Sequence, residues 1–124
     1  MWKLERNYLN ELSLAEEFFE SAKKNLNSSL RTSANRLYFA FEKAVVSYLC
    51  FKKVKIPRNH QKLWELADEL LGEGYYSLFR TLYDLRMQAD YRNISLFVEL
   101  DIKSIRDNLD KVESFVKKLK MDIL

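Results

Sequence analysis

Hydrophobic residues recur every three or four positions in five stretches of the chain, and polar or charged residues fill the positions between them. This period matches the turn of an α-helix that presents one side to a core. Short connections between such helices are typical of antiparallel neighbours. We therefore expect an all-α fold, an up-and-down antiparallel bundle of about five helices with a four-helix core. The predicted helices cover about residues 4–26, 30–53, 60–71, 75–91 and 102–119.

The second stretch is hydrophobic on more than one side. Leu37, Phe41 and Val45 follow the helical period, whereas Phe39 and Phe51 add hydrophobic surface elsewhere. A helix of this kind is either central in its bundle or covered on a second side by another subunit. Residues 92–100 lack a clear period, so we expect a loop there.

The composition indicates one globular domain over residues 1–124. Two glycines and one proline are too few turn-forming residues for a β-sandwich or barrel, and 48% of the residues are hydrophobic. No hydrophobic run approaches the ~18 residues of a membrane span, and the first residues lack a signal-peptide core, so we expect a cytoplasmic protein without membrane contact. One cysteine and one histidine cannot form a disulfide or a structural zinc site, and no metal or cofactor is predicted.

The positive charge of the chain is local. Residues 52–62 contain five basic residues and no acid, although the net charge of the whole chain is only +3. Such a stretch can bind phosphate or RNA. It can equally be a solvated helix end and turn, because lysines are favoured near helix C-termini. The basic residues of this patch are Lys52, Lys53, Lys55, Arg58 and Lys62.

Two predicted helices carry polar side chains that core packing does not require. Arg86 and Asp90 lie four residues apart in the fourth helix, so they share a face and can pair, and Tyr91 follows. A surface ion pair that only supports the helix would give the same pattern. In the second helix, Arg36 and Tyr38 can contribute to a site. Alternatively, Tyr38 is buried against the fourth helix and Arg36 pairs with Asp90.

His60 is the only histidine of the chain. An imidazole can transfer protons at neutral pH, so His60 is a catalytic candidate if folding brings it to Arg86 or Tyr91. The alternative is a partly exposed residue at the start of the third helix. The chain has no P-loop, dinucleotide-binding glycine motif, HExxH motif or serine-hydrolase elbow.

Four short motifs, taken in order, resemble the HEPN superfamily and, more narrowly, its small stand-alone prokaryotic members. The resemblance covers nearly the whole chain. The motifs are SANRLYFAF at 33–41, NHQK at 59–62, LRMQADY at 85–91 and SFVKKL at 114–119.

The resemblance implies a helical bundle that forms a homodimer, often encoded beside a minimal nucleotidyltransferase as a toxin–antitoxin module. Many members are metal-independent ribonucleases, in which an arginine late in the fourth helix is followed four to six residues later by a histidine. Arg86 matches this arginine, but Tyr91 stands where the histidine is expected, and a phenol is a poor base at neutral pH. In a related branch the partner modifies a tyrosine with nucleotide. The equivalent position here is Asn93, which leaves Tyr91 as the nearest acceptor.

Three functions follow as hypotheses. The first is a dimeric component that binds nucleotide or RNA and acts with a minimal nucleotidyltransferase. The second is a metal-independent ribonuclease in which four residues separate Arg86 from Tyr91, with His60 as a further catalytic candidate. The third is a dimerisation or scaffold module without enzymatic activity. The candidate ligand-binding residues are Arg36, Tyr38, His60, Arg86, Asp90 and Tyr91.

Overall fold

The computed structural model describes residues 7–92 and 98–124, and the described residues form five α-helices and no strand. This arrangement confirms the predicted all-α fold. The helices are α1 (Tyr8–Asn25), α2 (Leu30–Phe51), α3 (His60–Leu71), α4 (Tyr75–Tyr91) and α5 (Ile102–Ile123).

Polar side chains fix the starts of four helices. Asn7, Ser29, Asn59 and Asp101 precede α1, α2, α3 and α5, and each side chain accepts a hydrogen bond from a backbone N–H of the first turn. These bonds satisfy donors that the helix itself leaves unpaired. The start of α4 is different, because Gly74 has no side chain and the Asp68 carboxylate of α3 accepts from the Gly74 N–H instead, at 3.1 Å.

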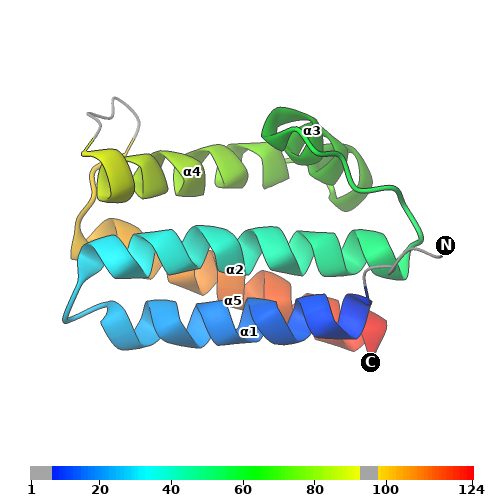
Figure 1. Cartoon of the computed structure of the whole chain (residues 1–124), viewed down its shortest axis with the longest axis horizontal. Coiled ribbons are helices and arrows are strands. Elements are labelled where there is room, and N and C mark those ends of the chain that lie inside the picture. Colours follow the sequence, from blue (N-terminus) through cyan, green and yellow to red (C-terminus); the bar gives the residue numbers. More distant parts are fainter. Residues whose placement is uncertain (1–6, 93–97) are drawn as a thin grey trace, which may run out of the picture.

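α2 is the central helix of the bundle. Figure 1 shows α1, α2, α4 and α5 with similar axes and alternating chain directions, while α3 lies at one end beside the start of α4. α2 packs on α1, α4 and α5. Small buried residues on α2, such as Ala34, Ala40 and Ala44, allow its neighbours to approach closely. The wide hydrophobic surface of the second predicted helix therefore reflects its central position.

The helix ends differ from the prediction by a few residues. α2 ends at Phe51, two residues early, because Lys53 adopts a left-handed backbone conformation with φ of 60°. α5 continues to Ile123 instead of ending near Leu119. Residues 4–6 of the first predicted helix and most of the predicted loop lie outside the described residues. Within the described ranges, no helix has the length and hydrophobicity needed to span a membrane.

Candidate functional site

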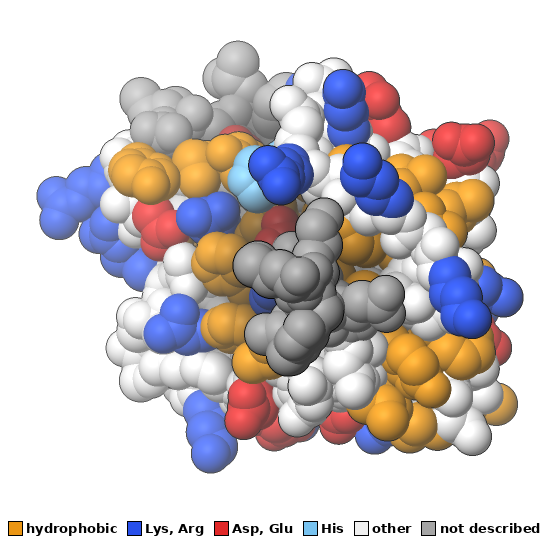
Figure 2. All heavy atoms as spheres, turned by 45° about the vertical axis from the view of Figure 1, so that its right-hand side comes forward, with side chains coloured by type: hydrophobic (Ala, Val, Ile, Leu, Met, Phe, Trp, Pro, Cys, Tyr) orange, Lys and Arg blue, Asp and Glu red, His pale blue; other side chains and the backbone are white. Residues whose placement is uncertain are grey.

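The basic patch of residues 52–62 does not converge on one point. Lys52 lies over the rings of Tyr48 and Phe51, with its Nζ 5.8 Å from each ring centre. Arg58 alone of the five basic residues lines a polar cavity of about 360 Å³ beside His60. Figure 2 looks toward this end of the molecule and shows cationic side chains spread between other residues, one of them next to the pale-blue histidine. Lys52 and Arg58 thus have different surroundings, and the basic patch does not gather around this cavity.

Arg86 lies half-buried among three aromatic rings. Its guanidinium carbon is 4.6 Å from the ring centre of Phe39, 5.4 Å from that of Tyr38 and 5.9 Å from that of Tyr83. Its Nε donates a hydrogen bond to the Asp90 carboxylate at 3.2 Å, one helical turn further along α4. The predicted pairing of Arg86 with Asp90 is therefore present, and aromatic faces stabilise the cation from α2 as well as α4.

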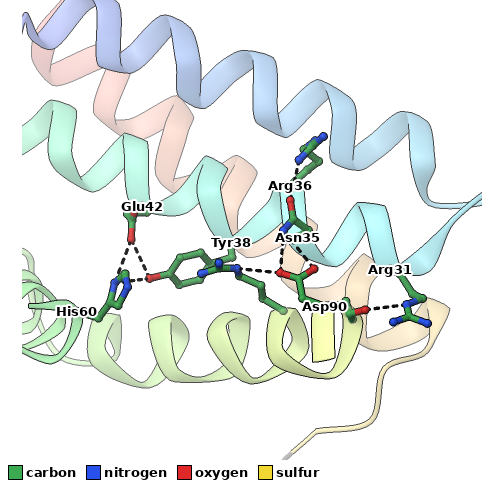
Figure 3. A network of polar contacts seen from close by, with 9 residues as sticks. Arg31, Asn35, Arg36, Tyr38, Glu42, His60 and Asp90 are labelled. Atoms are coloured by element: carbon green, nitrogen blue, oxygen red, sulfur yellow. Dashed lines mark hydrogen bonds and ion pairs between the residues drawn. The ribbon is translucent and has the colours of Figure 1, made fainter. Parts of the chain in front are cut away.

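Asp90 connects α4 to α2 through Asn35. The side-chain Nδ2 of Asn35 donates to both carboxylate oxygens of Asp90, at 3.0 and 3.3 Å. The side-chain Oδ1 of Asn35 accepts a hydrogen bond from the Arg36 guanidinium at 2.7 Å. Figure 3 shows Asn35 between Arg36, which points away from α4, and Asp90 on α4. The predicted alternative in which Arg36 pairs directly with Asp90 is wrong, because Asn35 stands between them. The Arg36 guanidinium lies 6.0 Å from the ring centre of Phe18 on α1.

Tyr38 is completely buried on α2, as one of the two predictions for it required. Its hydroxyl donates to the Glu42 carboxylate at 2.8 Å. Burial raises the pKa of the Tyr38 hydroxyl well above its usual range, and the neighbouring negative charge of Glu42 raises it further. The phenol therefore remains neutral and acts as a hydrogen-bond donor at physiological pH.

His60 joins Tyr38 and Glu42 from the first residue of α3. Its Nδ1 lies 3.3 Å from the Tyr38 hydroxyl and 3.5 Å from the Glu42 carboxylate, and 52% of its side chain is exposed. The His60 ring is 5.7 Å from that of Tyr83, measured between centres, so Tyr38 and Tyr83 both separate His60 from Arg86. Folding thus brings His60 into the same aromatic cluster as Arg86, but not into direct contact with it.

Tyr91 is a candidate site residue that does not contact the cluster around Arg86 and His60 in the described structure. It is the last residue of α4 and 65% of its surface is exposed, whereas the rings around the Arg86 guanidinium belong to Tyr38, Phe39 and Tyr83. Arg92 then ends the helix in a left-handed conformation. Asn93, the position equivalent to the modified tyrosine of the related branch, lies outside the described residues.

A row of cations and rings crosses the outer face of α1, α2 and α4. Arg36 lies over Phe18, the Phe18 ring is 5.7 Å from the Phe39 ring between centres, and Arg86 lies over Phe39. We call these four side chains the arginine–aromatic ladder. Both phenylalanines are half-buried. The sequence prediction did not include Phe18, Phe39, Asn35, Glu42 or Tyr83 among the site residues. For Phe39, its place off the main hydrophobic stripe was a usable signal.

The part of the chain that the structure describes contains no group of three or more His, Cys, Asp or Glu side chains placed to hold a metal ion. The polar groups of the site can bind ligands through hydrogen bonds, charge and stacking. Arg36 and Arg86 offer guanidinium groups to anions, and the ladder rings offer faces to planar groups.

The sequence was compared with models of known protein families, and one of them matches most of the chain. The model of the HEPN domain matches residues 10–121, which include all five helices except the first residues of α1 and the last of α5. A comparison with curated proteins gave no significant match. The matched region also contains every residue of the arginine–aromatic ladder and the Tyr38, Glu42 and His60 cluster. The chain belongs to the HEPN domain family.

Proposed function

We propose that this HEPN protein binds RNA or nucleotide as a homodimer and acts with a minimal nucleotidyltransferase in a two-gene, toxin–antitoxin-like module. The arginine–aromatic ladder is the observation that carries the proposal. Arg36 and Arg86 lie at its two ends and the rings of Phe18 and Phe39 lie between them. Bases stack on aromatic faces and arginines bind phosphates, so two neighbouring rings with a cation at each end suit a short single strand or a nucleotide.

The same geometry favours binding over cleavage. Asp90 already neutralises part of the Arg86 charge at 3.2 Å, which reduces the charge available to a phosphorane transition state. Tyr91 is exposed and apart from the rings that hold Arg86. The neutral, buried Tyr38 hydroxyl is a poor general base. We therefore propose that the chain is not an autonomous ribonuclease.

RNA binding tests the proposal directly. A fluorescein-labelled single-stranded RNA of about 12 nucleotides is titrated with purified protein at several salt concentrations, and anisotropy is recorded. Arg86→Ala should weaken binding about tenfold, since it removes one phosphate contact and one stacking partner. Arg106→Ala, on the exposed side of α5, is the matched control and should leave affinity nearly unchanged. Equal affinity of the wild type and Arg86→Ala would contradict the proposal.

The partner and the oligomeric state need separate experiments. Sedimentation equilibrium should give twice the chain mass. A nucleotidyltransferase reading frame beside the gene is expected, and its product should co-purify with this chain. Incubation of RNA with the protein in EDTA should leave the RNA intact, and cleavage that disappears in Arg86→Ala would instead support the ribonuclease function.

A scaffold function is the second candidate, because Asn35 and Arg31 both tie α2 to α4. Arg31 Nε donates to the Ala89 carbonyl oxygen at 2.7 Å, and Asn35 donates to Asp90. If these contacts serve packing alone, Arg86→Ala lowers the melting temperature but leaves RNA and partner binding unchanged. A change in affinity without a change in melting temperature would exclude this function.

A further inference from the structure

A groove of about 500 Å³ lies between the first half of α4 and the second half of α5. These two helices do not pack closely on each other, because α2 lies against both of them. Tyr75 and Phe115 line the groove, and both rings rest on the fully buried Phe41 of α2, at 6.1 and 5.4 Å between centres. The groove is therefore a preformed depression with an aromatic floor.

The groove is longer than this cavity alone. A second cavity of about 170 Å³ adjoins it and shares Tyr75, Phe115 and Lys118 with it. It continues toward Leu71 at the end of α3. An elongated groove with an aromatic floor between two helices is a shape that can receive an additional helix.

Two lysines on the rim of the groove have no ion pair among the described residues. Lys111 and Lys118 both line the groove, and no carboxylate of the described ranges lies within 4.0 Å of either ammonium group. Neighbouring lysines on α5 are paired: Lys117 with Glu113 at 3.7 Å and Lys120 with Glu16 at 3.3 Å. Glu73 also lines the groove and Asp122 lines the cavity that adjoins it, but neither carboxylate lies within 4.0 Å of the two ammonium groups, so both lysines remain free to pair with a ligand.

The spacing of these lysines matches an acidic helix. They lie seven residues apart, which is roughly 10.5 Å along α5 at 1.5 Å per residue. Two acidic residues seven apart on a second helix have the same separation and lie on one side of it. Ser114 and Phe115 lie between the two lysines, so hydrophobic residues of the second helix would meet the aromatic floor there.

We propose that this groove binds an amphipathic helix of a different protein, with two Asp or Glu residues seven apart facing Lys111 and Lys118 and hydrophobic residues between them packed on Phe115 and Tyr75. A second copy of this chain does not match, because no two acidic residues of its 124-residue sequence are seven apart. The elongated shape of the groove between two helices favours a helix over a nucleic acid, and the RNA affinity of the groove variant below tests the nucleic acid as occupant. The inference does not depend on the proposed RNA-binding function.

A designed peptide is the probe. It is a fluorescein-labelled helical peptide of about 16 residues with two glutamates seven apart and two leucines between them. Fluorescence anisotropy should show saturable binding to the full chain. Lys111→Glu with Lys118→Glu should weaken binding at least about tenfold. Lys103→Glu with Lys117→Glu makes the same change of charge on exposed α5 positions outside the groove and is the matched control.

Charge reversal provides a rescue that a misfolded variant cannot give. A peptide with lysines in place of both glutamates should bind the Lys111→Glu, Lys118→Glu variant better than it binds the wild type. A peptide with its glutamates five apart, on different helix faces, should bind weakly to both.

Three results would overturn the proposal. One is the absence of saturable peptide binding, and another is an equal loss of binding in the control variant. The third is a loss of RNA affinity or of dimerisation in the groove variant, which would assign the groove to RNA or to a second copy. Arg86, which the RNA-binding test changes, does not line this groove. The proposed RNA binding and the proposed helix binding can therefore fail independently of each other.

Discussion

The Asn35 amide on α2 donates hydrogen bonds to the Asp90 carboxylate on α4, across 55 residues of sequence. The same carboxylate accepts from Arg86 within α4. One acidic group therefore holds α2 against the end of α4 and also orients the guanidinium at one end of the arginine–aromatic ladder.

This relationship predicts a measurable coupling between two helices. Asp90→Ala should reduce the free energy of unfolding by about 1–2 kcal/mol, because it removes the acceptor of two half-buried side chains, Asn35 and Arg86. Asn35→Ala should cost less, about 1 kcal/mol, because Asp90 keeps its bond to Arg86. The double variant should lose less than the sum, with a coupling energy of about 0.5–1.5 kcal/mol in urea denaturation. Asp107→Ala, an exposed change on α5, should stay within about 0.5 kcal/mol of wild type. Strict additivity of the first two substitutions would contradict the coupling.

Arg92 offers a stabilising substitution. It ends α4 with φ of 57°, a left-handed conformation in which a side chain costs about 1 kcal/mol relative to glycine. Its backbone N–H bonds to the Gln88 carbonyl oxygen, and glycine would keep that bond. Arg92→Gly should therefore raise the free energy of unfolding by about 1 kcal/mol. Arg92→Ala removes the side chain but keeps the strain, so an equal gain there would contradict this explanation.

The helical period was sufficient to predict the fold, since hydrophobic side chains repeat at helical spacing wherever a helix faces the core. The ends were less predictable. The turn after α2 depends on the backbone of Lys53, and lysine rarely adopts positive φ. Only the tertiary structure brings Asp68 of α3 to the start of α4.

Within the candidate site, contacts inside one helix could be predicted from the sequence, whereas contacts between helices could not. Arg86 and Asp90 are four residues apart, so helical geometry alone indicates their pairing. Asn35 meets Asp90, and Phe18 meets Phe39, only through the packing of separate helices. The imidazole chemistry of His60 makes it a candidate from sequence alone. Its contacts with Tyr38 and Glu42 depend on the packing of α3 against the bundle, which the sequence pattern does not indicate.

The stability of the fold should depend on pH through Asp101. Hydrogen bonding from Ser104 at the start of α5, first of all its backbone N–H at 2.7 Å, lowers the pKa of the Asp101 carboxyl below its usual range. A lowered pKa in the folded state means that the carboxylate stabilises the fold above the unfolded pKa of about 3.9, and that this contribution disappears as pH falls through the lowered value. Asparagine also caps helices but carries no charge.

Asp101→Asn should therefore be less stable than wild type at about pH 6, and the difference should shrink as the pH falls through the lowered pKa of Asp101. Urea denaturation followed by circular dichroism across this range measures the difference. Asp107→Asn, which does not cap a helix, is the control and should show a smaller difference at about pH 6. A constant difference between wild type and Asp101→Asn at every pH would show that the charge of Asp101 is not responsible.

Arg86→Lys separates charge from stacking in the ladder. Lysine keeps the positive charge but loses the planar guanidinium that lies 4.6 Å from the Phe39 ring centre. RNA affinity should fall about threefold, while the slope of log affinity against log salt should stay close to wild type because the number of charged contacts is unchanged. Arg86→Ala should lower the affinity further and reduce the slope by about one. If lysine restored full affinity, charge alone would account for the role of Arg86, and stacking on Phe39 would contribute nothing measurable.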